Sequence, residues 1–172
     1  MKKLAIIITL MVFYTGISVA QKFAFVDTDY ILGNIPAYTA AQEKLDKFSD
    51  DWQKEIEALY KEIEDLYKSY QTDKIFLSEE MKTKRENDII EKEKNAKEVQ
   101  KKYFGPEGEL FKKRQELVKP IQDEIYNAIT EISAEGSYAV IFDTAAGLSL
   151  LYTNPKYDLS DEILQKLGYK SQ

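Results

Sequence analysis

The sequence contains neither histidine nor cysteine among its 172 residues. Disulfide bonds, thiolate nucleophiles, histidine general bases and zinc sites built from these residues are therefore excluded. Glycine is scarce, with 7 residues, and neither a GxGxxG nor a GxxxxGK motif occurs. Carboxylate, lysine, tyrosine and hydroxyl chemistry remain available, but no spacing typical of catalysis by these groups is present. We expect a protein that is not an enzyme and that needs no cofactor or metal ion.

Long hydrophobic runs are absent beyond the first twenty residues. Lys2 and Lys3 precede an apolar run over residues 4–17, and the small residues of a cleavage site follow at 18–20. We interpret residues 1–20 as a signal peptide cleaved near Ala20. The alternative is an uncleaved membrane anchor, for which the apolar run is short. The sequence thus predicts an exported protein that is not an integral membrane protein.

Basic residues are fewer than acidic ones, 24 against 30, which gives a net charge of −6. Loss of the signal peptide would remove two lysines and leave a mature charge of about −8. An acidic surface disfavours nucleic acid as a partner, because phosphates require basic residues. The remaining length suits one domain, which we place at residues 21–172.

After Pro36, apolar residues recur with a period of seven. They predict a long helix that begins at or just after this proline and ends near Gln71. The repeat consists of Leu45, Trp52, Ile56, Leu59, Ile63, Leu66 and Tyr70. Charged residues fill most of the other positions. The pattern is typical of a coiled-coil seam that extends over more than three heptads.

A second helix is predicted to run back along the first. Ser78 is followed by two glutamates, as at a helix N-cap, and Ile89, Ala96 and Tyr103 keep a seven-residue spacing. We therefore predict an antiparallel helical hairpin over residues 37–103. At about 1.5 Å per residue its helices reach on the order of 40–50 Å, so the hairpin must protrude as an arm.

The turn of the hairpin carries apolar residues that have two interpretations. They either cap the end of the coil or form an exposed fingertip that contacts other proteins. Two tyrosines also flank the seam at the same sevenfold spacing. The candidate contact residues are Tyr60, Tyr67, Ile75, Phe76, Leu77 and Met81.

The residues outside the arm, 21–36 and 104–172, are expected to form a small body. Two glycines and a proline within residues 104–108 interrupt the return limb. An amphipathic helix follows over residues 110–136, kinked at Pro120 and ended by Gly136. A last helix is expected between an N-cap at Ser160 and Gly168.

Three runs in the body read as short strands, at residues 22–26, 138–142 and 148–152. The first strand would pair with the last two, so that the arm is an insertion between them. Three strands this short make a poor core, and their edges need partners. We therefore expect an α+β, mostly helical fold that forms an oligomer through its sheet. The strand residues proposed to do so are Phe23, Phe25, Val140, Phe142, Leu148 and Leu150.

Asp27 and Asp143 each close a strand and are interpreted as turn-formers or helix caps, with a catalytic carboxylate pair as the minor alternative. Six segments carry a resemblance to a known family: residues 23–27 (FAFVD), 30–32 (YIL), 35–36 (IP), 119–121 (KPI), 136–143 (GSYAVIFD) and 158–164 (DLSDEIL). In this order, and behind a signal peptide, they resemble the Skp/OmpH family of periplasmic chaperones.

The resemblance implies a homotrimer with a small β-barrel body and three helical arms around a cavity. Such a protein holds unfolded outer-membrane β-barrel proteins in the periplasm without ATP. This chain departs from its relatives in charge, because their arms are basic and this chain is acidic. Lys82, Lys84 and Arg85 form only a small basic cluster near the tip, and no lipopolysaccharide site is carried over. The alternative function is that of a structural envelope protein or assembly adaptor whose arm binds one folded partner, with a carboxylate-only hydrolase a distant third.

Overall fold

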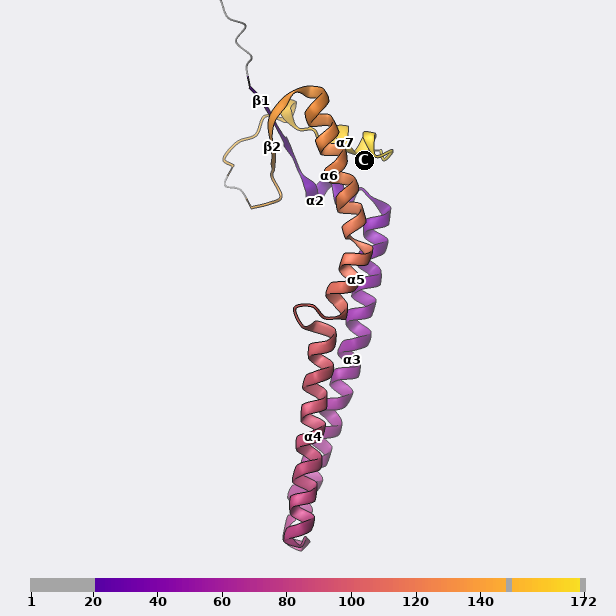
Figure 1. Ribbon diagram of the computed structural model, residues 1–172, viewed down its shortest axis with the longest axis vertical. Coiled ribbons are helices and arrows are strands. Elements are labelled where there is room, and N and C mark those ends of the chain that lie inside the picture. Colours follow the sequence, from indigo (N-terminus) through magenta and orange to yellow (C-terminus); the bar gives the residue numbers. More distant parts are fainter. Residues whose placement is uncertain (1–20, 148–149, 171–172) are drawn as a thin grey trace, which may run out of the picture.

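The computed structural model describes residues 21–147 and 150–170, which form a small body with one long arm (Figure 1). The body contains β1 (Lys22–Val26), α2 (Thr28–Gly33), α6 (Lys119–Gly136), β2 (Tyr138–Asp143), a 3₁₀ turn η2 (Pro155–Tyr157) and α7 (Ser160–Lys166). The arm contains α3 (Pro36–Asp73), a 3₁₀ turn η1 (Lys74–Phe76), α4 (Glu79–Phe104) and α5 (Glu109–Leu117). The expected α+β, mostly helical class is confirmed.

The two strands of the body are far apart in the sequence and pair in parallel, with Phe23 opposite Val140 and Val26 opposite Asp143. Parallel strands require a long crossover, and here the whole arm lies within it. The third strand expected at 148–152 is not formed over residues 150–152, while Leu148 lies outside the described residues. The side chains of 150–152 are exposed, so this run has no apolar surface of its own chain on which to extend.

The core of the body brings both ends of the chain together. Its buried residues are Ala24, Val26, Ile31, Leu32, Ile35, Ile125, Ala128, Ile132, Leu159, Ile163 and Leu164. They come from β1, α2, α6 and α7, so that residues on either side of the arm form one cluster. This cluster fixes the root of the arm, because α3 begins at Pro36, directly after the buried Ile35.

Two helix ends of the body differ from the sequence-based expectation. At the end of α6 the left-handed position is taken by Ser137, with φ of 54°, rather than by Gly136. Ser160 is the first residue of α7 and not its N-cap, because its Oγ has other partners. It accepts a hydrogen bond from the Asp27 backbone N–H at 2.9 Å and donates one to Asp158 Oδ1 at 2.6 Å. The side chain therefore joins α7 to the end of β1.

The arm is a hairpin whose return limb consists of two helices. With 38 residues, α3 is about 57 Å long. Its distal half packs on α4, and its proximal half packs on α5 and the start of α6 (Figure 1). In the proximal half Ala41 and Leu45 are buried against Val118. The arm therefore continues through α5, beyond the boundary expected at residue 103, and the chain breaks at Val118 instead of kinking at Pro120.

Candidate functional site

The predicted seam of α3 is buried at four of its seven positions. Leu45, Ile56, Ile63 and Tyr70 are buried, whereas Trp52 and Leu59 are half-buried. Leu66 departs from the expectation, because 37% of it is exposed at the edge of the seam. A single antiparallel partner covers a narrow stripe, and the α4 residues beside Leu66 are polar.

An aromatic cluster marks the level at which the return limb is interrupted. The ring of Trp52 stacks on Tyr103 with centroids 4.7 Å apart and planes 4° apart. Phe48 also stacks on Trp52, with ring centroids 5.5 Å apart, and Phe104 meets Trp52 edge-on at 6.4 Å. The cluster holds the end of α4 against α3 just before the turn at residues 105–108.

The two sides of the hairpin differ in the side-chain contacts that link α3 to α4. On one, which we call the polar flank, Lys92 pairs with Glu62 at 2.8 Å and Arg85 pairs with Asp73 at 2.9 Å. Nearer the body, the Tyr103 hydroxyl donates to Glu55 at 2.9 Å. These contacts cross from α4 to α3 at intervals along the arm, and the partly exposed Leu66 lies between them.

The opposite side, which we call the tyrosine flank, consists of Tyr60, Tyr67, Ile90, Lys97 and Gln100. Tyr60 donates a long hydrogen bond of 3.4 Å to Gln100, which places this part of α3 beside this part of α4. Tyr67, one heptad further out, is 53% exposed, and Ile90 is 61% exposed. This flank therefore presents large apolar side chains to solvent.

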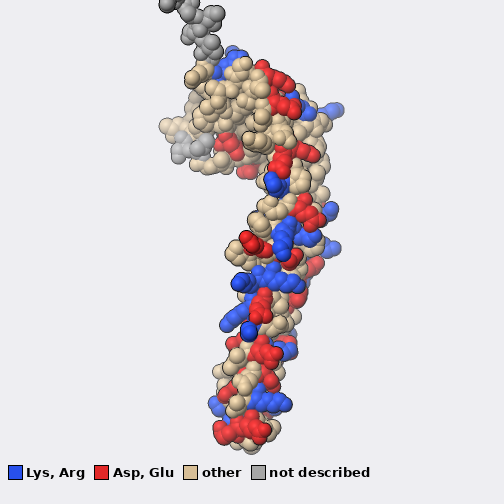
Figure 2. Space-filling view, in the orientation of Figure 1, with Lys and Arg blue, Asp and Glu red and all other residues tan. Residues whose placement is uncertain are grey.

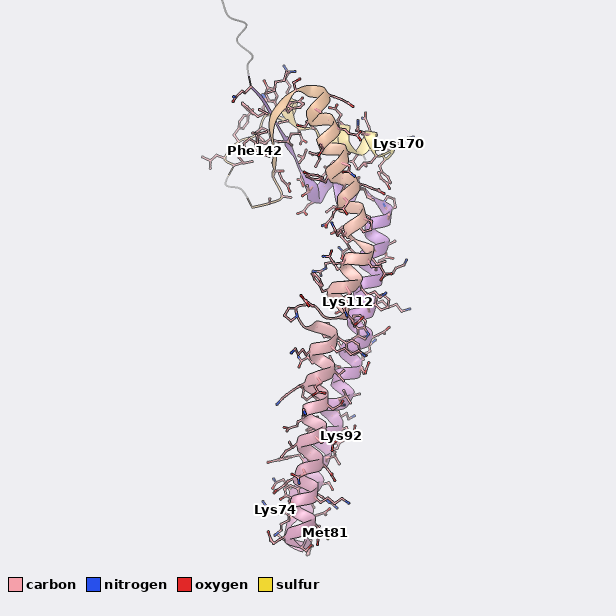
Figure 3. All side chains as sticks on the ribbon, in the orientation of Figure 1. Lys74, Met81, Lys92, Lys112, Phe142 and Lys170 are labelled. Atoms are coloured by element: carbon pink, nitrogen blue, oxygen red, sulfur yellow. The ribbon has the colours of Figure 1, made fainter. Side chains whose placement is uncertain are left out.

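At the tip of the arm, some apolar residues of the turn cap the coil and others are exposed, so each of the two interpretations holds for part of the turn. Leu77 packs against the core of the hairpin and caps it. Ile75 and Phe76 are 82% and 83% exposed, and Met81 is half exposed at the far end of the arm (Figure 3). Two members of the basic cluster near the tip are paired: Lys82 with Glu79, and Arg85 on the polar flank.

Four of the expected oligomerisation residues lie on the two-stranded sheet, whereas Leu150 follows it in a segment that forms no strand. Phe23 and Val140 are about half exposed, and Phe142 and Leu150 are more than a third exposed. Phe25 is half-buried and stacks on Phe142 with ring centroids 5.8 Å apart. Within the described residues the sheet has only β1 and β2. The outer edge of β1 is bridged at Phe25, whose carbonyl accepts a backbone hydrogen bond of 2.9 Å from the residue that precedes α7, so the open edge is that of β2.

The two aspartates at the strand ends bind backbone groups and hydroxyls. Asp27 caps α2 by accepting a hydrogen bond from the Tyr30 backbone N–H at 2.9 Å. Asp143 accepts hydrogen bonds from the backbone N–H and the hydroxyl of Thr28 at 3.2 and 2.7 Å. Both side chains thus act as cap or turn residues. Among the described residues there is no metal-type cluster of three or more acidic side chains.

The hydroxyl of Tyr70 donates a hydrogen bond to the Glu86 carboxylate across the hairpin, which raises the pKa of Tyr70 to about 12. Because the folded pKa lies above the ordinary value of 10, this contact stabilises the arm below pH 10 and is lost as the pH rises through 12. We expect Tyr70→Phe to lower the urea midpoint at neutral pH, and the difference from the parent to shrink between about pH 9 and pH 12. Tyr67→Phe, on the exposed flank, is the matched control, and a gap that stays constant with pH would contradict the assignment.

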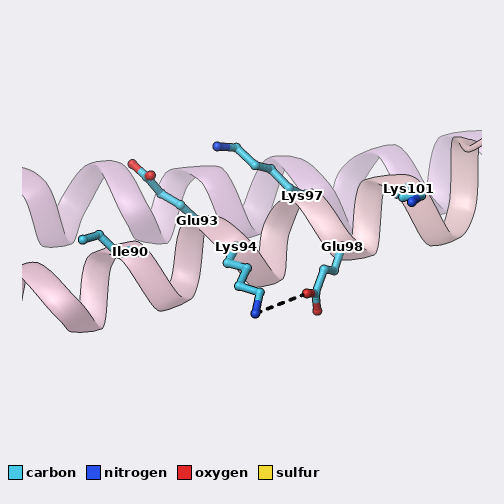
Figure 4. Close-up of a pocket in the computed structure, with 6 residues that line it drawn as sticks. All are labelled: Ile90, Glu93, Lys94, Lys97, Glu98 and Lys101. Carbon is cyan, nitrogen blue, oxygen red and sulfur yellow. Dashed lines mark ion pairs between the residues drawn. The ribbon is translucent and has the colours of Figure 1, made fainter.

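A feature that the sequence-based candidates missed is a shallow groove on the outer face of α4 (Figure 4). It is lined by Ile90, Glu93, Lys94, Lys97, Glu98 and Lys101. In the close-up, Glu93 and Lys97 project to one side, and Lys94 and Glu98 to the other. The spacing of Ile90, Lys94, Lys97 and Lys101 is that of one helix face, so the sequence contains the signal for this groove.

The fold and the arm define a class of protein with a small α+β body and a protruding helical hairpin. The family model described as outer membrane protein (OmpH-like) matches residues 22–167, and the chain belongs to this family. The resemblance inferred from the sequence is thus confirmed.

An uncharacterised protein from Aquifex aeolicus (strain VF5) is 29% identical over 167 residues, which cover 97% of this chain and 96% of that protein. A crystal structure of a candidate outer membrane chaperone (OmpH-like) from Caulobacter crescentus superposes with a TM-score of 0.65 at 13% identity. The match covers 87% of this chain and 85% of the other, and it shows a shared fold. No helix among the described residues is both long and apolar enough to span a bilayer.

Proposed function

We propose that this protein is an ATP-independent periplasmic holdase chaperone, which binds unfolded outer-membrane β-barrel proteins and prevents their aggregation on the way to the outer membrane. The arm is the observation that carries the proposal. Its seam is buried between its own helices, so the arm needs no partner to fold, while Tyr67, Ile75 and Phe76 remain exposed. Membership of the OmpH-like family and the description of the Caulobacter relative as a candidate chaperone support the same reading.

The proposed working form is a homotrimer. The exposed apolar side chains of β1 and β2 and the open edge of β2 favour association through the body. Three arms that extend from one body would surround a client and hold it by many weak contacts, which together exceed the affinity of each one. Residues 1–20, which we propose as the signal peptide for export to the periplasm, lie outside the described residues.

Two measurements on the mature protein test the proposal. Light scattering is expected to give the mass of a trimer. A urea-unfolded outer-membrane β-barrel protein, diluted into buffer, is expected to stay dispersed when one trimer is present per client. A stable monomer, or aggregation that is unaffected at this ratio, would count against the holdase.

The alternative of an assembly adaptor or structural envelope protein is favoured by one observation, the exposure of Ile75 and Phe76 on the tight turn η1 at the tip. An adaptor would bind a native partner saturably through these side chains. Ile75→Asp together with Phe76→Asp would then reduce that binding by at least tenfold, because two exposed apolar anchors are replaced by charges. For a holdase we expect the same pair to reduce client capture by less than threefold, since the flanks contribute most contacts.

A further inference from the structure

The two flanks of the arm differ in charge as well as in the contacts that link α3 to α4. The groove on the polar flank is lined by Glu62, Leu66, Asp88, Glu91, Lys92 and Asn95, three acids against one lysine. Its single lysine is already paired with Glu62 at 2.8 Å. An acidic polypeptide segment on this flank would meet like charge, which disfavours binding.

The groove on α4 beside the tyrosine flank has the opposite balance, with Lys94, Lys97 and Lys101 against two glutamates. The one ion pair within it, Lys94 with Glu98, is long at 3.9 Å, and both side chains are more than 60% exposed. Towards the body the charges of the adjoining groove are balanced, with three lysines against three glutamates. The basic excess is therefore confined to the groove between Ile90 and Lys101. Figure 2 shows basic side chains gathered on the viewed face midway along the arm, although the chain as a whole is acidic.

Apolar surface lies next to these lysines. Ile90 is 61% exposed at one end of the groove, and the exposed Tyr67 and Tyr60 lie on the neighbouring part of α3. Aromatic and aliphatic side chains that are already exposed can bind apolar side chains of an incoming chain without rearrangement of the hairpin. The groove on the polar flank lacks this combination of exposed apolar side chains with an excess of lysines.

We propose that the groove from Ile90 to Lys101, together with Tyr60 and Tyr67, is the client-docking face of the arm, and that it takes extended unfolded segments in which apolar and acidic side chains alternate. This inference rests on the proposed holdase function and names the face and the segment class. From Ile90 to Lys101 the helix rises about 16 Å, which matches about five residues of extended chain. Transmembrane β-strands have this alternating pattern of apolar and polar residues.

Site-specific crosslinking tests the face directly, because the chain has no cysteine and any introduced thiol is unique. A photoactivatable probe is attached at Ile90→Cys or Lys97→Cys on the docking face, and at Asp88→Cys or Asn95→Cys at the same depth on the polar flank. With a urea-unfolded outer-membrane β-barrel protein as client, we expect crosslinking to be at least fivefold higher from the first pair. Equal yields, or a higher yield from the second pair, would overturn the assignment.

Charge reversal tests the segment class. Lys94→Glu, Lys97→Glu and Lys101→Glu together are expected to weaken binding of the unfolded client roughly tenfold, as for the loss of three exposed charge contacts. The control is the reversal of Lys54, Lys61 and Lys68, three lysines spaced by seven on α3, which changes net charge equally. Equal loss in both triple variants would show that only net charge matters and would refute the groove.

The outcomes separate this inference from the function on which it rests. If the parent protein suppresses aggregation while crosslinks form on the polar flank, the holdase stands and the docking face is wrong. If the parent protein fails to suppress aggregation, the proposed function falls and the docking face falls with it. Circular dichroism of each variant checks that the hairpin has folded before binding is compared.

Discussion

Ile163→Ala is expected to lower the free energy of unfolding by about 3 kcal/mol, within the usual range for deletion of a fully buried isoleucine side chain. Ile163 is 0% exposed in the core of the body, on the short helix α7. The neighbouring Leu164 and the residues of α2 and α6 pack in the same cluster, so the cavity left by the substitution cannot collapse easily. Because the core is small, this is a large share of the stability of the body.

The matched control is the same substitution at an exposed site. Ile75→Ala removes an identical side chain that is 82% exposed at the tip of the arm, and its expected effect is below about 0.5 kcal/mol. Urea unfolding of both variants at one protein concentration measures the difference, since association shifts apparent stability by mass action. Comparable losses in the two variants would mean that α7 is not docked on the body as described.

Gly108→Ala is expected to force apart the turn between α4 and α5 and to lower the free energy of unfolding by about 2–3 kcal/mol. A Cβ at this position would lie 2.7 Å from the Tyr103 carbonyl oxygen and 2.8 Å from that of Lys102. It would also lie 2.9 Å from the Gly105 nitrogen, and all three of these neighbours are backbone atoms. The turn is closed by a hydrogen bond from the Gly108 N–H to the Gly105 carbonyl, so the clash cannot be relieved by a side-chain rotation.

Trp52 reports this change, because it is the one tryptophan of the sequence and stacks on Tyr103 at the start of the turn. We expect its fluorescence to shift towards that of a solvated indole in Gly108→Ala, together with a lower urea midpoint. Gly33→Ala is the control, since a Cβ there meets nothing within 4 Å. An unchanged spectrum and midpoint in Gly108→Ala would show that the turn is looser than the close approach of its backbone implies.

The arm could be predicted from the sequence because its signals are local. The sevenfold spacing of Ile56, Ile63 and Tyr70 selects a helical period directly, and α3 begins at Pro36 as expected. Ser78 is the N-cap that the sequence predicts, and it accepts a hydrogen bond from the Met81 backbone N–H. Such features depend on residues within one or two turns of each other, so no tertiary information is needed to find them.

The body and the docking face could not be predicted as well, because they depend on the placement of distant elements. The helix α2 has only six residues and depends on Asp27 for its cap and on the core for its burial. The polarity of Ser160 suggested a cap, whereas its actual partners come from β1 and from Asp158. Ile89 and Ile90 are adjacent on α4, and only one of them can face α3. The structure buries Ile89 and leaves Ile90 exposed, a choice that depends on how α4 is rotated against α3.

The parallel pairing of β1 with β2 has a consequence for the order of folding. The hairpin can grow from its tip, where contacts such as that between Tyr70 and Glu86 join residues only 16 apart in the sequence, so it can form early and quickly. The sheet must wait until both ends of the insertion are present, and closing so long a loop is entropically costly. A chain delivered from its N-terminus therefore exposes Phe23 and Phe25 on an unpaired strand until β2 arrives. The early hairpin shortens the gap that this strand must close, because both of its limbs return to the same root.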